Sequence, residues 1–395
     1  MKCSLAALIL YILMSHRRNR EMPSETNRGS VTEFYIIYKD GVHNNTKGKG
    51  RVSARLRCPR QQKLRERVIE MCTAIDFFSG KNYFGRNLDL EITYGQHPVI
   101  TPSGYPFRFR KMGTIEDHPA IIGMAIVMDG FPLYFEGAND RGIGVAGLNF
   151  PGNAYYHQCK EGMDNIASFE VVPWILCNCS TMDDVKSLVK KMNVADIDFS
   201  PDMPASTLHW MVSDGRESIV LESVKDGLKV YENPVGVMTN NPTFDKQLFN
   251  LNNYRKLSAV DPEDTFGDGY SLDKYSRGMG TDGMPGGMSS EERFVKCAFT
   301  KLNSPKFDDE NDAVGQFFHI LHSVEQQKGC CQVAPGSFEY TIYSCCINMD
   351  DMIYYYTTYD NNQITGVRMS DYDVTGSDLI QVPIVEKQQI LFQEH

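Results

Sequence analysis

Residues 72–86 contain three short segments: CTAIDF at residues 72–77, SGKN at residues 79–82 and NYFGR at residues 82–86. The first and third segments have the composition of strands, whereas SGKN combines residue types that are typical of a tight turn. Two such strands joined by a short turn form an antiparallel hairpin. The sequence therefore predicts a hairpin that begins at Cys72 and whose second strand returns toward that residue.

The same order of strand, turn and strand recurs along the chain. It predicts strands at residues 133–136 and 143–149 on either side of the turn Asn139-Asp140-Arg141-Gly142. Further strands are expected at residues 208–213, 218–223, 228–232, 340–347 and 352–358. Strands connected by hairpins form largely antiparallel sheets.

Helices are expected between these strands. Thr181 is a suitable N-cap, since Asp183 and Asp184 follow it at the positive end of the helix dipole. One apolar face is formed there by Val185, Leu188, Val189 and Met192. Two more helices are predicted at residues 291–302 and 312–324. Antiparallel hairpins with segregated helices indicate a layered α+β protein, and no repeat or boundary rich in Pro, Gly and Ser divides residues 72–395.

Charge separates the chain into two parts. The net charge of −10 argues against a nucleic-acid partner, which would require clustered Lys and Arg. Residues 1–71 carry 15 Lys and Arg against 6 Asp and Glu, a balance of +9, which leaves −19 for residues 72–395. The sequence therefore predicts a basic N-terminal extension at 1–71 and one folded domain at 72–395.

Three interpretations of the extension stay open: a removable propeptide, a basic interaction tail, or upstream translation of a gene whose start is Met71. The apolar run at residues 5–14 is too short to cross a bilayer and has no small-x-small cleavage site after it. We favour a start at Met71, because an initiator Met before a small residue is normally removed. Its removal would make Cys72 the N-terminal residue.

Eleven cysteines in so long a chain are too sparse for a disulfide scaffold, and their spacings do not match a zinc site. We expect reduced, mostly buried thiols and a cytoplasmic location. No metal or cofactor is expected, since the glycine-rich stretch at residues 278–290 follows no strand and lacks the Lys of a phosphate-binding loop.

Cys72, Arg86 and Asp89 suggest a reactive thiol. The returning strand carries Arg86 and Asp89 back toward Cys72. A cation beside a thiol favours the thiolate, and a carboxylate can hold a free α-amine in place as proton acceptor. From the residues alone, a buried core thiol and a surface ion pair between Arg86 and Asp89 stay open.

Six ordered motifs resemble the choloylglycine hydrolase family across residues 72–395. They are MCT at residues 71–73, FGRNLD at 84–89, GLNFP at 147–151, TLHWM at 207–211, TNNPTFD at 239–245 and ERF at 292–294. The resemblance implies a four-layer αββα sandwich of two antiparallel sheets, an N-terminal-nucleophile hydrolase, and commonly a homotetramer.

The resemblance also implies a role for each site residue. Cys72 is expected to be the nucleophile in a partly exposed site, with its own α-amine as general base. Arg86 is expected beside the sulfur, Asp89 beside the amine, and Arg293 as a second guanidinium. Asn240 through its side-chain amide and Asn149 through its backbone N–H are expected to bind the oxyanion. Local patterns alone would make Asn240 a turn residue and Arg293 a solvated charge.

Within the family, Asn at position 149 is typical of bile salt hydrolases, whereas penicillin V acylases often have Tyr. The resemblance therefore implies hydrolysis of glycine- or taurine-conjugated bile salts. The alternatives are a penicillin V acylase or related N-acyl amide hydrolase, including one for N-acyl homoserine lactones, and a silent binding protein if Cys72 is not freed. Arg277, in a variable loop, is a candidate contact for the anionic end of the conjugate.

Overall fold

The predicted hairpin at Cys72 lies within the first of two large sheets. The computed structural model describes residues 71–393. Strand β1 (Met71–Ser79) pairs along its length with β2 (Lys81–Leu90), which places Cys72 opposite Leu88 and Ala74 opposite Arg86. Gly80 forms the turn with a φ of 68°, a conformation that favours glycine. The hairpin is therefore confirmed, with strands longer than predicted.

Within the described residues, the first sheet has seven strands in the order β14-β1-β2-β16-β17-β18, and β15 pairs with β16. All of these pairs are antiparallel. The strands added to the hairpin are β14 (Val237–Met238), β15 (Cys331–Ala334), β16 (Ser337–Asn348), β17 (Ile353–Thr358) and β18 (Asn361–Arg368).

The second sheet has eight strands in the described part of the chain, in the order β13-β12-β11-β8-β7-β6-β3-β19. It is also antiparallel. Its strands are β3 (His97–Thr101), β6 (Ile121–Met128), β7 (Phe131–Asn139), β8 (Gly144–Asn149), β11 (Leu208–Ser213), β12 (Ser218–Val224), β13 (Gly227–Glu232) and β19 (Ile380–Gln381). Two small pairs are separate: β4 (Phe107–Phe109) with β5 (Gly113–Ile115), and β9 (Asp164–Ala167) with β10 (Met192–Ala195).

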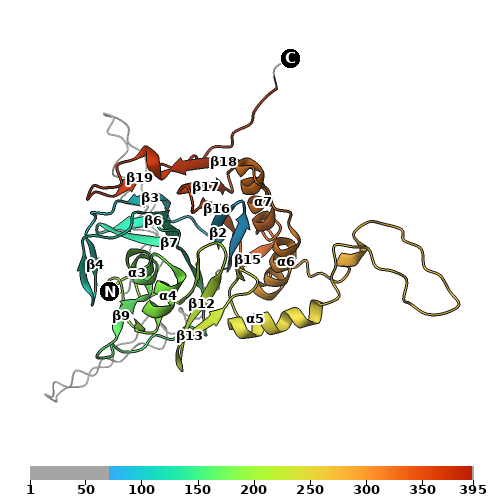
Figure 1. Ribbon diagram of the computed structural model, residues 1–395, viewed down its shortest axis with the longest axis horizontal. Coiled ribbons are helices and arrows are strands. Elements are labelled where there is room, and N and C mark those ends of the chain that lie inside the picture. The colour runs from blue at the N-terminus through green and yellow to red at the C-terminus, as the bar shows by residue number, and fades with distance from the viewer. Residues whose placement is uncertain (1–70, 394–395) are drawn as a thin grey trace, which may run out of the picture. The chain divides into compact units, whose positions relative to one another are not determined.

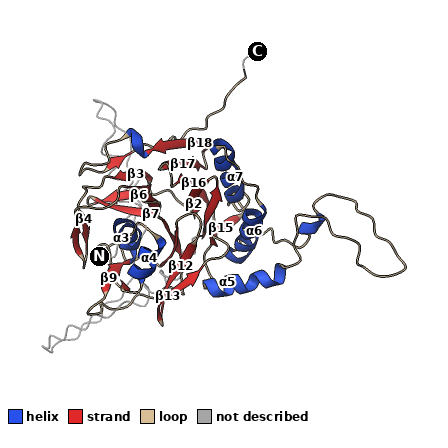
Figure 2. Ribbon diagram, in the orientation of Figure 1, coloured by secondary structure: helices blue, strands red, loops and turns tan. Residues whose placement is uncertain are grey.

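Helices cover the outer faces of both sheets (Figures 1 and 2). α6 (Ser290–Asn303) and α7 (Glu310–His322) contact the first sheet, α3 (Val171–Asn178) contacts the second, and α4 (Met182–Val189) contacts α3. The sheets contact each other through β1, β2 and β8. α5 (Phe244–Asn250) packs beside α6. This is the four-layer αββα arrangement, and the predicted α+β class is confirmed.

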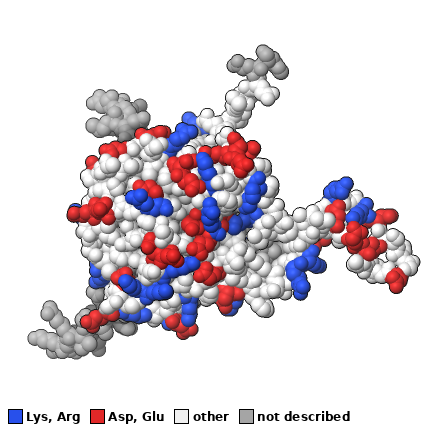
Figure 3. Space-filling model, viewed as in Figure 1, with Lys and Arg blue, Asp and Glu red and all other residues white. Residues whose placement is uncertain are grey.

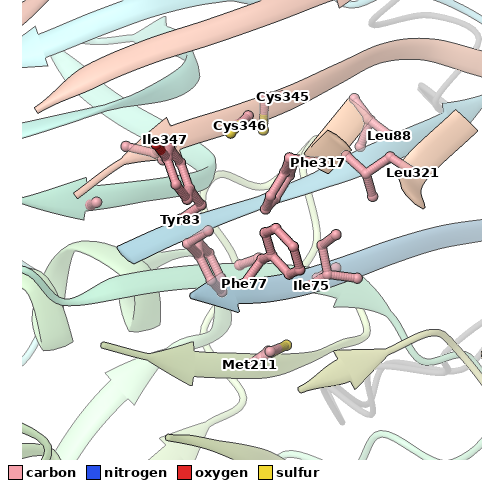
Figure 4. Close-up of a cluster of buried hydrophobic side chains, with 14 of the residues drawn as sticks. Ile75, Phe77, Tyr83, Leu88, Met211, Phe317, Leu321, Cys345, Cys346 and Ile347 are labelled. Atoms are coloured by element: carbon pink, nitrogen blue, oxygen red, sulfur yellow. The ribbon is translucent and has the colours of Figure 1, made fainter. Parts of the chain in front are cut away.

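The first sheet is buried on both faces. On its helix side, Phe77 of β1 and Phe317 of α7 meet edge to face with ring centroids 6.5 Å apart. Figure 4 shows these rings with Ile75, Tyr83 and Leu321 in one buried cluster. Because successive strand residues point to opposite faces, Cys72 and Ala74 point toward the second sheet. The nucleophile candidate therefore lies between the two sheets.

The predicted cap is confirmed: Thr181 caps α4 by accepting a hydrogen bond from the Asp184 N–H. Asp309, which was not predicted as a cap, caps α7. The helix α4 is shorter than its apolar pattern indicated, because it ends at Val189 and Met192 begins β10. The helix α3 was not predicted. Nearly all of its residues are buried, so its sequence VVPWILCN lacks the polar face that marks a surface helix.

The proposed extension falls almost entirely outside the described residues. Only Met71 of residues 1–71 is described, and it is the first residue of β1. The division into 1–71 and 72–395 therefore stays a prediction. No helix among the described residues is long and apolar enough to cross a membrane.

A long loop leaves the layered body between α5 and α6, and we call residues 255–289 the arm (Figure 1). Its regular structure is the short 3₁₀ turn η3 (Met279–Thr281). Figure 3 shows both acidic and basic side chains on it. Large apolar side chains are exposed there too: Val260, Phe266, Tyr270, Leu272 and Tyr275.

Candidate active site

Cys72 lies near the beginning of β1 and is only 2% exposed. Its backbone N–H donates a 2.8 Å hydrogen bond to Asn240 Oδ1, and its carbonyl accepts a 2.6 Å hydrogen bond from Arg293 Nη1. The expectation of a partly exposed site is wrong for this form of the chain, in which Met71 still precedes Cys72. Met71 continues the strand, and the Cys72 side chain lies in the buried core cluster.

Arg86 is on the same face of the hairpin as Cys72 and is 1% exposed. Its Nη1 donates to the carbonyl oxygens of Gly147 at 2.6 Å and Phe135 at 3.2 Å, both in the second sheet. Burial alone would lower the pKa of this guanidinium, but the ionised forms of Cys72, Tyr343 and Glu136 outweigh burial and raise it. Arg86 is therefore a buried cation within electrostatic reach of the Cys72 sulfur.

Asp89 lies on the opposite face of the hairpin, toward α6. Its backbone is opposite Met71 in the β1–β2 register, and its Oδ1 accepts a 2.6 Å hydrogen bond from Thr341. Its Oδ2 is 4.0 Å from Arg293 Nη1 and has no hydrogen-bond partner among the described residues. Burial raises the pKa of this carboxyl to about 6, against the lowering effects of Arg293, Thr341 and Arg86.

The raised pKa of Asp89 predicts how the stability of the chain that retains Met71 depends on pH. The folded carboxyl, with a pKa of about 6, holds its proton more tightly than an unfolded Asp, whose pKa is about 3.9. The protonated carboxyl therefore favours folding fully below about pH 4, and this contribution is lost as the pH rises to about 6. We expect the Tm of the uncleaved chain to fall over that interval relative to Asp89→Asn. Parallel Tm curves for the two proteins would contradict the assignment.

Arg293 and Asn240 complete a cluster around the Cys72 backbone. Arg293 donates to the Cys72 carbonyl, to Thr73 Oγ1 at 2.6 Å and to Asn240 Oδ1 at 2.8 Å. Asn240 Nδ2 donates to the Asn149 carbonyl at 2.8 Å. Arg293 is 1% exposed, so the local interpretation of a solvated charge is wrong. The structure thus brings together Cys72, Arg293, Asn240 and Asn149, which are far apart in sequence.

The loop that carries Asn240 is held from two sides. The backbone N–H of Asn240 donates to Ser290 Oγ at the start of α6. On the other side, His209 Nε2 lies 2.8 Å from the Thr239 carbonyl, and a carbonyl can only accept, so this nitrogen carries a hydrogen. The His209 ring stacks on Phe150 at 4.3 Å. His209 therefore helps to hold the loop that carries Asn240.

Met71 is bound by residues that the sequence analysis did not identify. Its backbone N–H donates to the buried carboxylate of Glu339, and Gln326 Nε2 is 3.8 Å from its sulfur. Glu339 belongs to β16 and is 1% exposed. No sequence pattern distinguished Glu339 or Gln326 from other polar residues near strand ends.

Arg277 does not join this cluster. It lies in the arm with its side chain 99% exposed, and its Nη1 is 3.7 Å from Asp261. Within residues 71–393, no group of three or more His, Cys, Asp or Glu side chains is arranged to hold a metal ion. The nine cysteines described are all free thiols, and six of them are buried.

Comparisons with known proteins identify the family of the chain. The family model described as linear amide C–N hydrolases, choloylglycine hydrolase family, matches residues 72–382. A bile salt hydrolase/transferase from Lactiplantibacillus plantarum is 51% identical over 319 residues, which is 81% of this chain and 98% of the relative. One from Bifidobacterium longum is 38% identical, covering 79% of this chain and 99% of the relative.

Solved structures show the same fold. A mutant conjugated bile acid hydrolase from Clostridium perfringens superposes with a TM-score of 0.76 at 33% identity, covering 82% of this chain and all of that one. A penicillin V acylase from Agrobacterium tumefaciens superposes with a TM-score of 0.61 at 17% identity, covering 80% of this chain and 94% of that one. The second likeness concerns the fold alone. Together with the family match, these relatives establish that the chain belongs to the choloylglycine hydrolase family of linear amide C–N hydrolases.

Proposed function

We propose that this protein hydrolyses the amide bond of glycine- or taurine-conjugated bile salts, with Cys72 as nucleophile. The observation that carries the proposal is the convergence of Arg86, Arg293, Asn240 and Asn149 on Cys72 in a chain half identical to a bile salt hydrolase/transferase. Asn149, which is typical of bile salt hydrolases, favours this substrate over penicillin V.

The reaction begins when the α-amine of a freed Cys72 accepts the thiol proton and the sulfur attacks the amide carbon. Collapse of the tetrahedral intermediate breaks the C–N bond, and the ammonium returns its proton to the departing nitrogen. Glycine or taurine leaves, and the bile acid stays bound as a thioester. Water then attacks the thioester with the same amine as base, which releases the bile acid and restores the thiol.

Asn240 and Asp89 support the proposed base. Asn240 Oδ1 already accepts a hydrogen bond from the Cys72 nitrogen, so it can hold a freed amine in the same direction. The second oxygen of Asp89, opposite Met71, lacks a hydrogen-bond partner among the described residues. Removal of Met71 leaves this carboxylate available to the new amine. Arg86, on the other face, favours the thiolate.

Asn240 and Asn149 are the proposed oxyanion donors. One hydrogen of Asn240 Nδ2 is used by the Asn149 carbonyl at 2.8 Å, which fixes the amide plane and leaves the second hydrogen for the substrate oxygen. The Asn149 backbone N–H is the second proposed donor. Donors fixed before the reaction stabilise the developing charge, and loss of one costs about 10²- to 10³-fold in rate.

The proposal is tested by assaying the chain that begins at Cys72 with glycocholate, taurocholate and penicillin V. We expect faster turnover of the bile salts. Preferential turnover of penicillin V would make the protein a penicillin V acylase. If an added assay shows hydrolysis of N-acyl homoserine lactones alone, those lactones are the substrate instead. No turnover by a folded chain with a free Cys72 would favour a silent binding protein.

Arg277 gives a separate prediction on amino acid preference. A guanidinium matches a carboxylate bidentately, which favours glycine conjugates. Contact with the conjugate requires that the arm close over the site, because the Arg277 side chain is 99% exposed. If it acts there, Arg277→Ala lowers kcat/KM for glycocholate more than for taurocholate. An unchanged ratio removes Arg277 from the substrate site.

We further propose a homo-oligomer, with a tetramer as the family expectation, and a cytoplasmic location. The arm supports assembly with copies of the same chain, since it exposes Phe266, Tyr270 and Tyr275 by 79%, 71% and 83%. Exposed apolar surface of this kind is typical of protein contacts. Light scattering of the purified protein measures the assembly, and a monomer at micromolar concentration would contradict it.

A further inference from the structure

Glu136 is a carboxylate buried in the space between the two sheets. It lies on β7 and is 0% exposed. Its Oε2 accepts a 2.6 Å hydrogen bond from the Tyr343 hydroxyl, and its Oε1 accepts a 2.7 Å hydrogen bond from the Tyr354 hydroxyl. The Arg86 Nε lies 3.9 Å from Oε2. A buried carboxylate of this kind is costly unless its ionised form has such partners.

A β-bulge turns Glu136 into this space. In the pairing of β6 with β7, Met124 is opposite Glu136 but Ala125 is opposite Tyr134, so Phe135 is an extra residue. Residues two apart in a regular strand share a face. Here Tyr134 belongs to the core under α3, whereas Glu136 contacts tyrosines of the first sheet. The bulge therefore re-aims Glu136 and leaves the Phe135 carbonyl to accept from Arg86.

Arg86 therefore interacts electrostatically with two anions, the Glu136 carboxylate and the ionised Cys72 sulfur. Its Nη1 is fixed by the carbonyls of Gly147 and Phe135, and Glu136 flanks its Nε. The Cys72 sulfur, when ionised, is a second anion that raises the pKa of Arg86. Three further titratable groups among the described residues interact with the guanidinium: Asp89, Tyr343 and Cys345. Burial raises the pKa of Tyr343 and Cys345 well above the usual range, and it raises the pKa of Asp89 to about 6.

We propose that Glu136 is a positioning residue for catalysis: it holds the Arg86 guanidinium between its own carboxylate and the Cys72 sulfur, and so limits how strongly Arg86 stabilises the thiolate. This inference rests on the proposed role of Cys72 as nucleophile. Glu136 itself touches neither the sulfur nor the substrate. Its effect on the reaction passes through the charge and position of Arg86.

The limit matters because nucleophilicity and acidity oppose each other. A thiolate that is stabilised too strongly is abundant but attacks weakly, since nucleophilicity falls with pKa with a Brønsted slope of about 0.4 to 0.5. A carboxylate close to Arg86 offsets part of the guanidinium charge. The pKa of the Cys72 thiol then stays between the value without Arg86 and the value with Arg86 acting alone. Loss of the Glu136 charge therefore leaves Arg86 to act on Cys72 alone, which lowers the thiol pKa.

The test is Glu136→Gln in the protein whose N-terminal residue is Cys72. The rate of Cys72 alkylation by iodoacetamide is measured against pH, with mass spectrometry to identify the alkylated cysteine. We expect the apparent thiol pKa to fall by about 1, the size of one partly screened charge at this range. The matched control is Glu170→Gln, a fully buried carboxylate at η1 (Ser168–Glu170) whose partners are the Ala167 and Arg110 N–H groups. It should leave the pKa unchanged.

A second variant weakens the Glu136 charge without changing Glu136 itself. Burial raises the pKa of the Glu136 carboxyl, and the Tyr354 hydroxyl is one of the groups that oppose this rise, so Tyr354→Phe favours the protonated carboxyl. We expect the Cys72 pKa to fall, in the same direction as in Glu136→Gln but by less. A merely structural role would shift the pKa in Glu170→Gln as well, because that variant also neutralises a fully buried carboxyl. An unchanged or raised pKa in folded Glu136→Gln overturns the proposal, and if that variant does not fold, an unchanged or raised pKa in Tyr354→Phe does so.

Alkylation does not require turnover, so the two proposals fail separately. If the parent hydrolyses no amide but Glu136→Gln and Tyr354→Phe both lower the Cys72 pKa and Glu170→Gln does not, the proposed function fails and the role of Glu136 stands. If the parent is active and both variants resemble Glu170→Gln, the proposed function stands and Glu136 has no positioning role.

Discussion

Cys72→Ala is expected to abolish amide hydrolysis and to leave the fold intact. The substitution removes one sulfur atom from a residue whose backbone contacts, to Asn240 and Arg293, are retained. Without the sulfur no acyl-enzyme forms, so kcat/KM should fall by about 10³-fold or more. Cys72→Ser should retain little activity, because a hydroxyl is a far weaker nucleophile than a thiolate at neutral pH. The measurement is glycocholate hydrolysis together with the Tm of each variant.

A matched control distinguishes loss of the nucleophile from loss of a buried thiol. Cys179 is 1% exposed and lies in the core under α3 and α4, away from the hairpin. Cys179→Ala deletes the same atom from a comparably buried position, so it should change Tm by a similar amount and keep the activity of the parent. Activity near that of the parent in Cys72→Ala would exclude Cys72 as the nucleophile.

The fold was predictable where local patterns and packing agree. Alternation, turn residues and capping chemistry predict the hairpin from Cys72 to Arg86, the strand at residues 208–213 and the cap Thr181. α3 was missed because it is buried almost all round, and a continuous apolar run does not distinguish a strand from a helix.

Sequence patterns predict the positions of some site residues and not of others. Arg86 and Asp89 are near Cys72 in sequence, so a hairpin suffices to place them. Arg293 and Asn240 lie 221 and 168 residues away and reach Cys72 only through the layered packing of α6 and the loop before α5. Their local patterns indicate a solvated charge and a turn, and only resemblance to a family assigned them to the site.

The position of Glu136 could not be predicted from the sequence for a different reason. A single Glu after a run of apolar strand residues, as in FPLYFE at residues 131–136, ordinarily indicates a solvent-facing position. The bulge at Phe135 reverses that expectation, and it depends on the register with β6, which a single strand does not reveal. The two tyrosines that bind Glu136 come from strands more than 200 residues later.

The second large effect concerns the residue before Cys72. In a chain that retains Met71, the nitrogen of Cys72 is a peptide amide, which is no base, and Met71 occupies the strand position opposite Asp89. We expect a chain that starts at Met71, with that Met removed, to be fully active. A matched chain that retains Glu70 and Met71 should have the same fold and lose about 10²- to 10⁴-fold in rate, the usual contribution of a general base. Mass spectrometry of the N-terminus defines each protein, and glycocholate hydrolysis measures the difference.

Full activity in a chain shown to retain Met71 would mean that another group accepts the thiol proton. An insoluble chain from Met71, alongside an active uncleaved chain of 395 residues, would instead make residues 1–71 part of the folded enzyme.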